Sequence, residues 1–207
     1  MRVLSIGAHP DDIEIGCGGA LLWHRKRNDD VHMVVMTDDF REGKESCRLR
    51  RREAERSAEL LGASLTFGGF QDKALETLPA IELIEKVAAE FAPSLVYVHD
   101  PNDSHQDHRT TSLATMSALR RERSILCYKG LSSRDANANA YVDIGEFLDA
   151  KAELVEQHRS QVQPAGWIDV DLLVSIARTT GHAARSDFAE GFVVERLSLT
   201  GAFEAMT

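Results

Sequence analysis

Two short segments of this sequence combine histidine and aspartate in patterns that suit metal binding. The first is Ala8-His9-Pro10-Asp11-Asp12, and the second runs from His99 to His108. A histidine followed three residues later by a carboxylate can direct both side chains to one point, and Pro10 stiffens the turn between them. Imidazole and carboxylate groups are both common zinc ligands. Both segments also have a simpler interpretation, because aspartate is a favoured helix N-cap and polar loops are usually solvated.

Short apolar runs alternate with helical patterns, and this alternation predicts how the two segments are held. Buried strands are expected at 3–7, 31–36, 64–67, 95–98 and 125–128, with helices at 18–27, 46–61, 80–91 and 109–121. Beyond residue 130 the pattern weakens, with a strand expected at 141–144, helices at 147–158 and 170–178, and a last strand near 192–194. The pattern predicts an α/β fold, with a Rossmann-like, doubly wound, mostly parallel sheet and C-terminal additions.

Each polar segment follows the end of a predicted strand, where open parallel sheets place their sites. If the sheet reverses direction after its third strand, the strands 3–7 and 95–98 become neighbours and the two segments face one crevice. His108 would then lie beside His9 and Asp12. Three nitrogen or oxygen ligands with an open fourth position are typical of a catalytic zinc site. The sequence therefore predicts such a site at this edge of the sheet.

The composition is that of an ordinary globular protein. With 207 residues, of which 43% are hydrophobic and 28% charged, the chain suits one domain spanning 1–207. A net charge of -9 argues against a nucleic-acid partner, and no apolar run is long enough for a membrane span. Cys17, Cys47 and Cys127 lack metal-type spacing and are interpreted as free thiols. Because the N-terminal apolar run is too short for a secretion signal, we expect a cytoplasmic location.

A longer set of motifs carries a family resemblance. Ala-His-Pro-Asp-Asp at 8–12 is followed by Glu14 and the glycines at 16, 18 and 19, and His105-x-Asp107-His108 comes about a hundred residues later. Together with 37–43, 57–62, 70–72 and 158–161, these motifs resemble the LmbE-like, or PIG-L, family of zinc-dependent N-deacetylases over most of the chain. The resemblance implies a Rossmann-like fold, a divalent metal (usually Zn²⁺), hydrolysis of the N-acetyl group of an N-acylated amino sugar, and a homo-oligomer.

The resemblance also implies a role for each polar residue of the two segments. By position, His9, Asp12 and His108 would ligate the metal. Asp11 would stay unligated and act as the general base that takes a proton from the metal-bound water. His105 would stabilise the charge that develops on the carbonyl oxygen, with Asp107 beside it fixing its tautomer and orientation. A plain surface histidine and aspartate are the alternative for His105 and Asp107.

Two further residues are expected near the substrate on the same positional grounds, Arg41 and Asp72. Arg41 can hold hydroxyl or phosphate oxygens, although an ordinary solvated arginine also fits. Asp38-Asp39-Phe40 precedes Arg41 where small residues are usual in the family, which alters the expected shape of the sugar pocket.

Other charged groups have mainly structural interpretations. The arginine-rich run 48–52 predicts a solvated helix face paired with the glutamates at 53, 55 and 59, and a phosphate-bearing substrate is the alternative. His24 and His32 are expected to be structural, and His99 to cap its strand. His158 and His182 are not expected to be ligands.

Three functional alternatives stay open. The same site would also cleave a non-sugar or thiol-conjugate amide, since only the pocket shape separates these substrates. A nucleotide-binding module is suggested by the glycines at 16, 18 and 19, but the third glycine of that fingerprint is missing. A non-catalytic metal-binding protein would leave Asp11 without a role.

Overall fold

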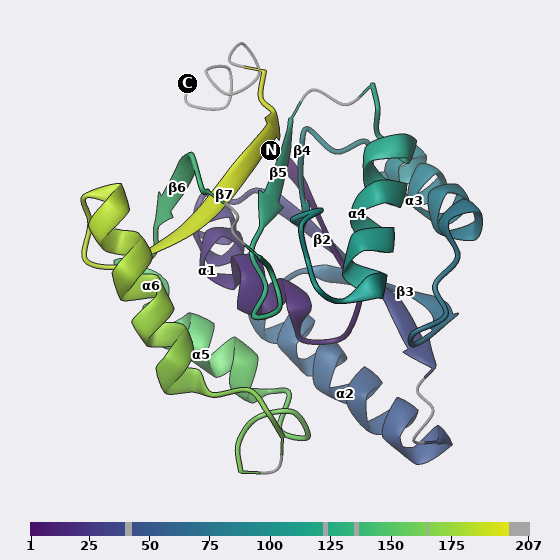
Figure 1. Ribbon diagram of the computed structural model, residues 1–207, viewed down its shortest axis with the longest axis horizontal. Helices are drawn as coiled ribbons and strands as arrows, with labels where there is room; N and C mark the ends of the chain where they lie inside the picture. Colours follow the sequence, from purple (N-terminus) through teal and green to yellow (C-terminus); the bar gives the residue numbers. More distant parts are fainter. Residues whose placement is uncertain (40–42, 122–123, 135–136, 165, 199–207) are drawn as a thin grey trace.

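One seven-stranded sheet organises the molecule (Figure 1). The computed structural model describes residues 1–39, 43–121, 124–134, 137–164 and 166–198. Its strands are β1 (Arg2–Gly7), β2 (Asp30–Asp39), β3 (Ser64–Gln71), β4 (Leu95–His99), β5 (Ile125–Tyr128), β6 (Ala140–Asp143) and β7 (Ala189–Arg196). Its helices are α1 (Asp12–Lys26), α2 (Lys44–Leu61), α3 (Thr77–Phe91), α4 (Gln106–Ala118), the 3-10 turn η1 (Gly145–Phe147), α5 (Leu148–Glu156) and α6 (Val170–Ala184).

The strand order is β3-β2-β1-β4-β5-β7-β6, which places β1 between β2 and β4. Strands β1 to β5 are parallel, whereas β7 runs antiparallel to both β5 and β6. Strands β2 and β3 are added on one side of β1, and β4 and β5 on the other. The order in which strands are added therefore reverses after the third strand, and the loops after β1 and β4 leave the same edge of the sheet. The predicted Rossmann-like, mostly parallel α/β fold with C-terminal additions is confirmed.

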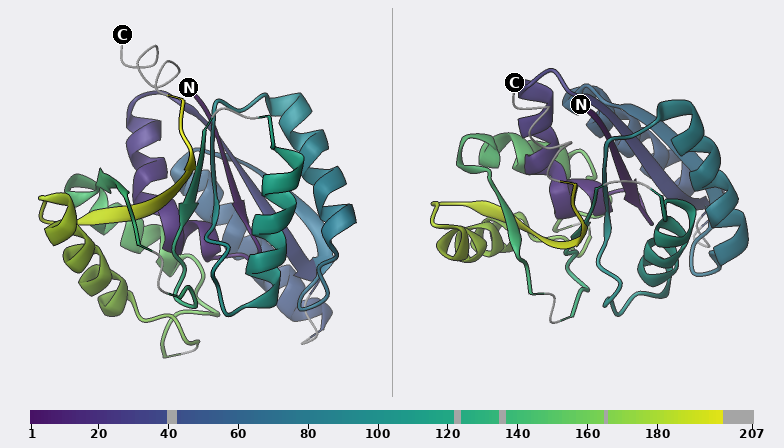
Figure 2. Two further views of the ribbon diagram at one scale, coloured as in Figure 1. Left: turned by 45° about the horizontal axis from the view of Figure 1, so that its top comes forward. Right: turned by 90° about the horizontal axis from the view of Figure 1, so that it is seen from above.

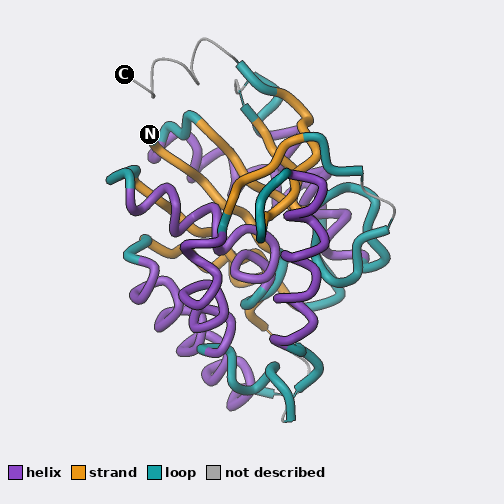
Figure 3. Tube along the Cα trace, turned by 90° about the vertical axis from the view of Figure 1, so that its left-hand side faces the viewer, coloured by secondary structure: helices purple, strands orange, loops and turns teal. Residues whose placement is uncertain are grey.

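Helices cover both faces of the sheet (Figure 2). On one face α1, α2 and α5 pack on alternate strand residues such as Val3 and Met33. On the other face α3 and α4 pack on the residues between them, such as Leu4 and Val34. Figure 3 shows the helices lying along the strands. None of the helices in the described ranges has both the length and the apolar character needed to cross a membrane.

Several element boundaries differ from those predicted. Helix α1 begins at Asp12, inside the first polar segment and before the predicted start at residue 18, and it is kinked at Cys17, whose φ of -146° is not helical. Helix α4 begins at Gln106, so His108 lies in its first turn and not before it. Strand β3 extends to Gln71. The backbone N–H of Ile15 donates to the carbonyl of Asp11 at 3.0 Å, and this bond starts α1 ahead of the glycines.

A close approach between α1 and β5 explains one motif glycine. A Cβ atom added to Gly16 would lie 2.1 Å from Cδ2 of Tyr128. This tyrosine is fully buried, and its hydroxyl donates to the carbonyl of Ile6 at 2.9 Å. The ring therefore cannot move aside without breaking that bond. Only glycine lets the start of α1 come this close to the sheet.

We expect Gly16→Ala to lower the free energy of unfolding by about 1–3 kcal/mol, the usual cost of overpacking a core. Gly18→Ala in the same helix is the matched control, because its added Cβ would make only ordinary contacts, the nearest with Lys151 Cγ at 3.6 Å. Without a clash, the change at Gly18 should be nearly neutral, within about 1 kcal/mol of the wild type. Urea unfolding of both variants measures the difference. Equal stabilities would contradict this packing argument.

Candidate active site

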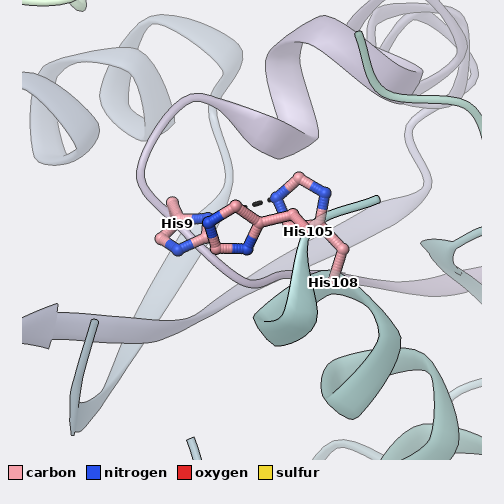
Figure 4. Close-up of side chains that lie close together, drawn as sticks. All are labelled: His9, His105 and His108. Atoms are coloured by element: carbon pink, nitrogen blue, oxygen red, sulfur yellow. Dashed lines mark hydrogen bonds between the residues drawn. The ribbon is translucent and has the colours of Figure 1, made fainter. Parts of the chain in front are cut away.

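The turn after β1 and the first turn of α4 bring three potential metal ligands together. The Nδ1 atom of His9 lies 3.2 Å from Nε2 of His108 and 3.3 Å from Oδ2 of Asp12. The other oxygen of Asp12, Oδ1, lies 3.3 Å from Nε2 of His108. Figure 4 shows His9 and His108 close together, with His105 beside them. The structure thus places the three predicted ligands side by side.

These separations fit a zinc ion. Zinc bonds to nitrogen and oxygen are about 2.0–2.2 Å long, so tetrahedral ligands lie roughly 3.3–3.5 Å apart. Other sets of nearby donors in the described residues also fit a metal: His9 with His105 and His108, Asp12 with His99 and His108, and His9 with Asp72 and Asp107. The hydrogen bonds of each ring distinguish between these sets.

Carboxylates behind His9 and His108 decide which ring nitrogen is available. The Nε2 atom of His9 lies 3.0 Å from Oδ1 of Asp72 and 3.4 Å from Oδ2 of Asp107. The Nδ1 atom of His108 lies 3.2 Å from Oδ1 of Asp103. Because a carboxylate only accepts, each of these nitrogens carries a proton, and in the neutral ring the opposite nitrogen has the lone pair. The lone pairs of His9 Nδ1 and His108 Nε2 therefore point to the shared centre, in the manner of carboxylate-supported metal ligands.

His105 is arranged as a hydrogen-bond donor. It is the N-cap residue of α4, and its Nδ1 accepts the backbone N–H of Asp107 at 3.2 Å. Burial, followed by the neighbouring His9 and His108, lowers the pKa of His105, so the ring is neutral. A neutral ring that accepts at Nδ1 carries its proton on Nε2. This ring suits donation to a substrate oxygen better than metal binding.

The carboxylate of Asp107 contacts a different histidine from the one expected. Its carboxylate Oδ2 accepts the backbone N–H of Lys73 at 2.6 Å and lies near Nε2 of His9. Its backbone N–H, not its carboxylate, fixes the tautomer of His105. The reason is helix geometry, since the second residue of a helix directs its N–H toward the N-cap side chain. The expectation that the Asp107 carboxylate orients His105 is corrected accordingly.

Asp11 lies beside the cluster and is buried, with 2% of its surface exposed. Its backbone φ of 108° is in the left-handed region, an unfavourable conformation for a non-glycine residue that is characteristic of functional sites. Burial raises the pKa of Asp11 to about 6, although Arg50 partly opposes the shift. The Nη2 atom of Arg50 lies 3.2 Å from Oδ2 of Asp11 and donates to the carbonyl of Pro10 at 3.0 Å.

The pocket in front of these groups has a volume of about 300 Å³, within the range of small-molecule sites. Asp72 lies in its wall, where one of its oxygens contacts His9 and the other is 3.2 Å from Nζ of Lys73. Arg41, the other predicted substrate contact, lies outside the described residues. The pocket is lined by His9, Asp11, Asp12, Arg50, Asp72, Lys73, His105, His108, Ser132, Gln161 and Trp167.

Sequence reasoning missed several of these groups. Arg50 was predicted to be solvated, but its side chain is 13% exposed and faces Asp11. Glu53 was expected to pair with the arginines, yet it is buried and accepts both the N–H and the hydroxyl of Ser160. His99 lies under the cluster, with its Nε2 3.1 Å from Oδ2 of Asp12 and its ring stacked on that of His108 at 4.0 Å. Its place directly after the predicted strand 95–98, as the first residue of the second segment, was the available signal.

His9 and His108 carry protons that a metal must displace. Burial lowers the pKa of His108, but Asp12 and Asp103 raise it by more, to about 9. Burial also lowers the pKa of His9, and its carboxylate partners again raise it by more. The raised pKa of each ring favours its charged form, whereas only the neutral imidazole can ligate.

We therefore expect zinc binding at pH 7 to release protons, and zinc affinity to fall as the pH is lowered. Isothermal calorimetry in two buffers of different ionisation enthalpy measures the release. Identical binding enthalpies in the two buffers would show that no proton is displaced.

The fold and the site define an α/β protein with a His/Asp cluster that can hold a metal, next to the Asp11 carboxylate, which is paired with Arg50. Residues 4–119 match the model of the PIG-L family, described as GlcNAc-PI de-N-acetylase, and the chain belongs to this family.

Two curated relatives and one solved structure agree with this membership. The uncharacterised deacetylase YaiS of Escherichia coli is 33% identical over 61% of this chain and 72% of its own length. Diacetylchitobiose deacetylase of Thermococcus kodakarensis is 29% identical over 92% of this chain and 81% of its own. The structure of N,N′-diacetylchitobiose deacetylase from Pyrococcus horikoshii, solved with the inhibitor MPG, has a TM-score of 0.82 and 25% identity over 98% of this chain and 85% of its own. Deacetylases hydrolyse an amide bond, and this predicted enzyme class is confirmed.

Proposed function

We propose that this chain is a zinc-dependent N-deacetylase that hydrolyses the N-acetyl amide of an amino-sugar-containing small molecule. The observation that carries the proposal is the convergence of His9 Nδ1, Asp12 and His108 Nε2 beside the unligated carboxylate of Asp11. A purely structural metal site has no use for a buried carboxylate that lies at its edge without ligating. The deacetylases of the same family support an N-acetyl substrate.

The metal, held by His9, Asp12 and His108, would polarise the amide carbonyl and acidify a water molecule. The chain itself handles the protons. Asp11 takes one proton from the water whose oxygen attacks the carbonyl carbon, and it returns this proton to the amine nitrogen as the C–N bond breaks. Acetate and the free amine are the products. The pKa of Asp11, raised to about 6, suits a group that must both accept and donate near neutral pH.

Two further side chains contribute to the proposed reaction. The Nε2–H of His105 donates to the carbonyl oxygen as that oxygen gains negative charge, which favours the transition state over the substrate. The Arg50 guanidinium holds the Asp11 carboxylate in place and keeps its pKa from rising further. Arg41 and Asp72 remain our proposed substrate contacts.

Acetate release from a panel of N-acetyl compounds tests the proposal. The zinc-loaded protein should release acetate from N-acetylglucosamine, N,N′-diacetylchitobiose or a phosphorylated N-acetylglucosamine. Release only from N-acetylcysteine conjugates or ring-free acetamides would instead favour an amidase for non-sugar substrates. A nucleotide-binding module is disfavoured, because the glycines of its supposed phosphate turn lie within α1.

We also propose a reducing compartment, the cytoplasm, as the location. Cys17, Cys47 and Cys127 are free thiols, and Cys17 and Cys127 are buried, which supports this location.

A further inference from the structure

One large aromatic side chain lies in the wall of the active-site pocket and is not used by the mechanism. Trp167 is 57% exposed although it is the bulkiest residue type. The other described residues that line the pocket are all polar or charged. Single exposed apolar residues are common on protein surfaces, so the informative observation is that this indole lines the catalytic pocket.

The residue that follows Trp167 is firmly held. The next residue, Ile168, is fully buried in an apolar cluster with Ile15, Val155 and Leu173. Its N–H donates to the carbonyl of Gln161 at 2.8 Å, and its carbonyl accepts the N–H of Gln163 at 2.9 Å. These bonds close the loop at its base. Trp167 is therefore anchored by its neighbour and is not carried on a free loop tip.

A second set of contacts ties the start of this loop to the catalytic side of the molecule. The N–H and hydroxyl of Ser160 donate to Glu53 at 2.9 and 2.6 Å, and Glu53 lies one helical turn after Arg50 on α2. The Nε2 atom of His158 lies 3.0 Å from Oε1 of Glu14 in the first turn of α1. The loop is thus fixed to the two helices that also carry Asp12 and the partner of Asp11.

The pocket accordingly offers one flat apolar surface within an otherwise polar wall. A pyranose ring has matching chemistry, because its hydroxyl groups project around the rim while one ring face presents only C–H groups. The face of an indole carries partial negative charge, which attracts the polarised C–H groups of a sugar and favours stacking. A linear acetamide offers no comparable face.

We propose that Trp167 is a specificity-determining residue, the platform on which the pyranose ring of the substrate stacks while its acetamido group reaches the metal ligands. The inference rests on the proposed function and adds the reason why this site selects a ring-shaped substrate. Without the indole, the affinity for a sugar should fall, whereas the affinity for an acetamide without a ring should change little.

Two variants and a matched control test the platform. The measured quantity is the ratio of kcat/KM for N-acetylglucosamine to kcat/KM for N-acetylethanolamine, which lacks a ring. Trp167→Ala should lower this ratio about tenfold or more, and Trp167→Phe, which keeps a smaller ring, should recover most of the loss. Leu172→Ala, which removes another exposed apolar side chain (47% exposed) that does not line the pocket, should leave the ratio unchanged. An unaltered ratio in Trp167→Ala, with the wild type active on the sugar, would overturn the proposal.

Fluorescence gives a readout that does not depend on turnover. The chain has two tryptophans, so Trp23→Phe leaves Trp167 as the single emitter, and Asp11→Asn in the same protein prevents hydrolysis. N-acetylglucosamine should change the emission in a saturable way, and N-acetylethanolamine should not. If the emission stays constant although equilibrium dialysis detects bound sugar, the stacking role of Trp167 is wrong, whereas the proposed deacetylase function is unaffected. Failure of the wild type to release acetate from any sugar would instead sink the proposed function.

Gel filtration separates the platform from a covered interface. Trp167→Ala should elute at the wild-type volume. A shift to a smaller species would mean that another copy of the chain covers the indole, and the platform would then be wrong.

Discussion

Asp11→Asn should lower kcat by about 10²–10⁴, the range typical of losing a general base, while the protein keeps its zinc. Asparagine has nearly the same shape as aspartate but cannot take a proton from water. Asp11 is not among the potential ligands of the cluster, so its loss should not release the metal. Initial rates of acetate release measure the effect.

Zinc content and the thermal midpoint serve as controls for this variant. Removal of the charge also leaves Arg50 facing a neutral amide, so a small change in stability is expected. A kcat within about threefold of the wild type would remove Asp11 from the general-base role, since that role is worth at least about a hundredfold. Loss of zinc would show that Asp11 is itself a ligand.

His108→Ala and His105→Ala should have different consequences although the two rings are adjacent. Removal of His108 takes away a lone pair aimed at the metal, so both zinc and activity should be lost, the latter by about 10³-fold or more. Removal of His105 takes away only an N–H donor. His105→Ala should therefore retain zinc and lose about 10²–10³ in kcat, as at other oxyanion-stabilising positions.

Metal analysis after dialysis, followed by kinetics with added zinc, measures both variants. The pair is informative because His9, His105 and His108 could together hold a metal by distance alone. Equal loss of zinc from the two variants would make His105 a ligand. The assignment of its Nδ1 as an acceptor from Asp107 would then be wrong.

The central part of the site could be predicted because its signals are local. His9 and Asp12 lie three residues apart in one turn, and His108 is placed by the strand that precedes its segment. One topological rule, the reversal after the third strand, was enough to bring the two segments together. The order β2-β1-β4 confirms that rule for this chain.

The rest of the site depends on packing that the sequence does not reveal. Which arginine of α2 faces inward depends on how this helix crosses the turn after β1, and Arg50 is nearly buried whereas Arg48 is 69% exposed. Trp167 reaches the pocket because its loop closes through a backbone pair between Gln161 and Ile168, which has no sequence signature. The place of Asp107 was also unpredictable, because it follows from α4 beginning at Gln106.

The most direct test of the account is to locate zinc in crystals of the protein by anomalous scattering at the zinc absorption edge. The account predicts one strong peak bonded to Nδ1 of His9, a carboxylate oxygen of Asp12 and Nε2 of His108, with Asp11 close by but unbonded. A peak among His9, Asp72 and Asp107, or one bonded to Asp11, would contradict it.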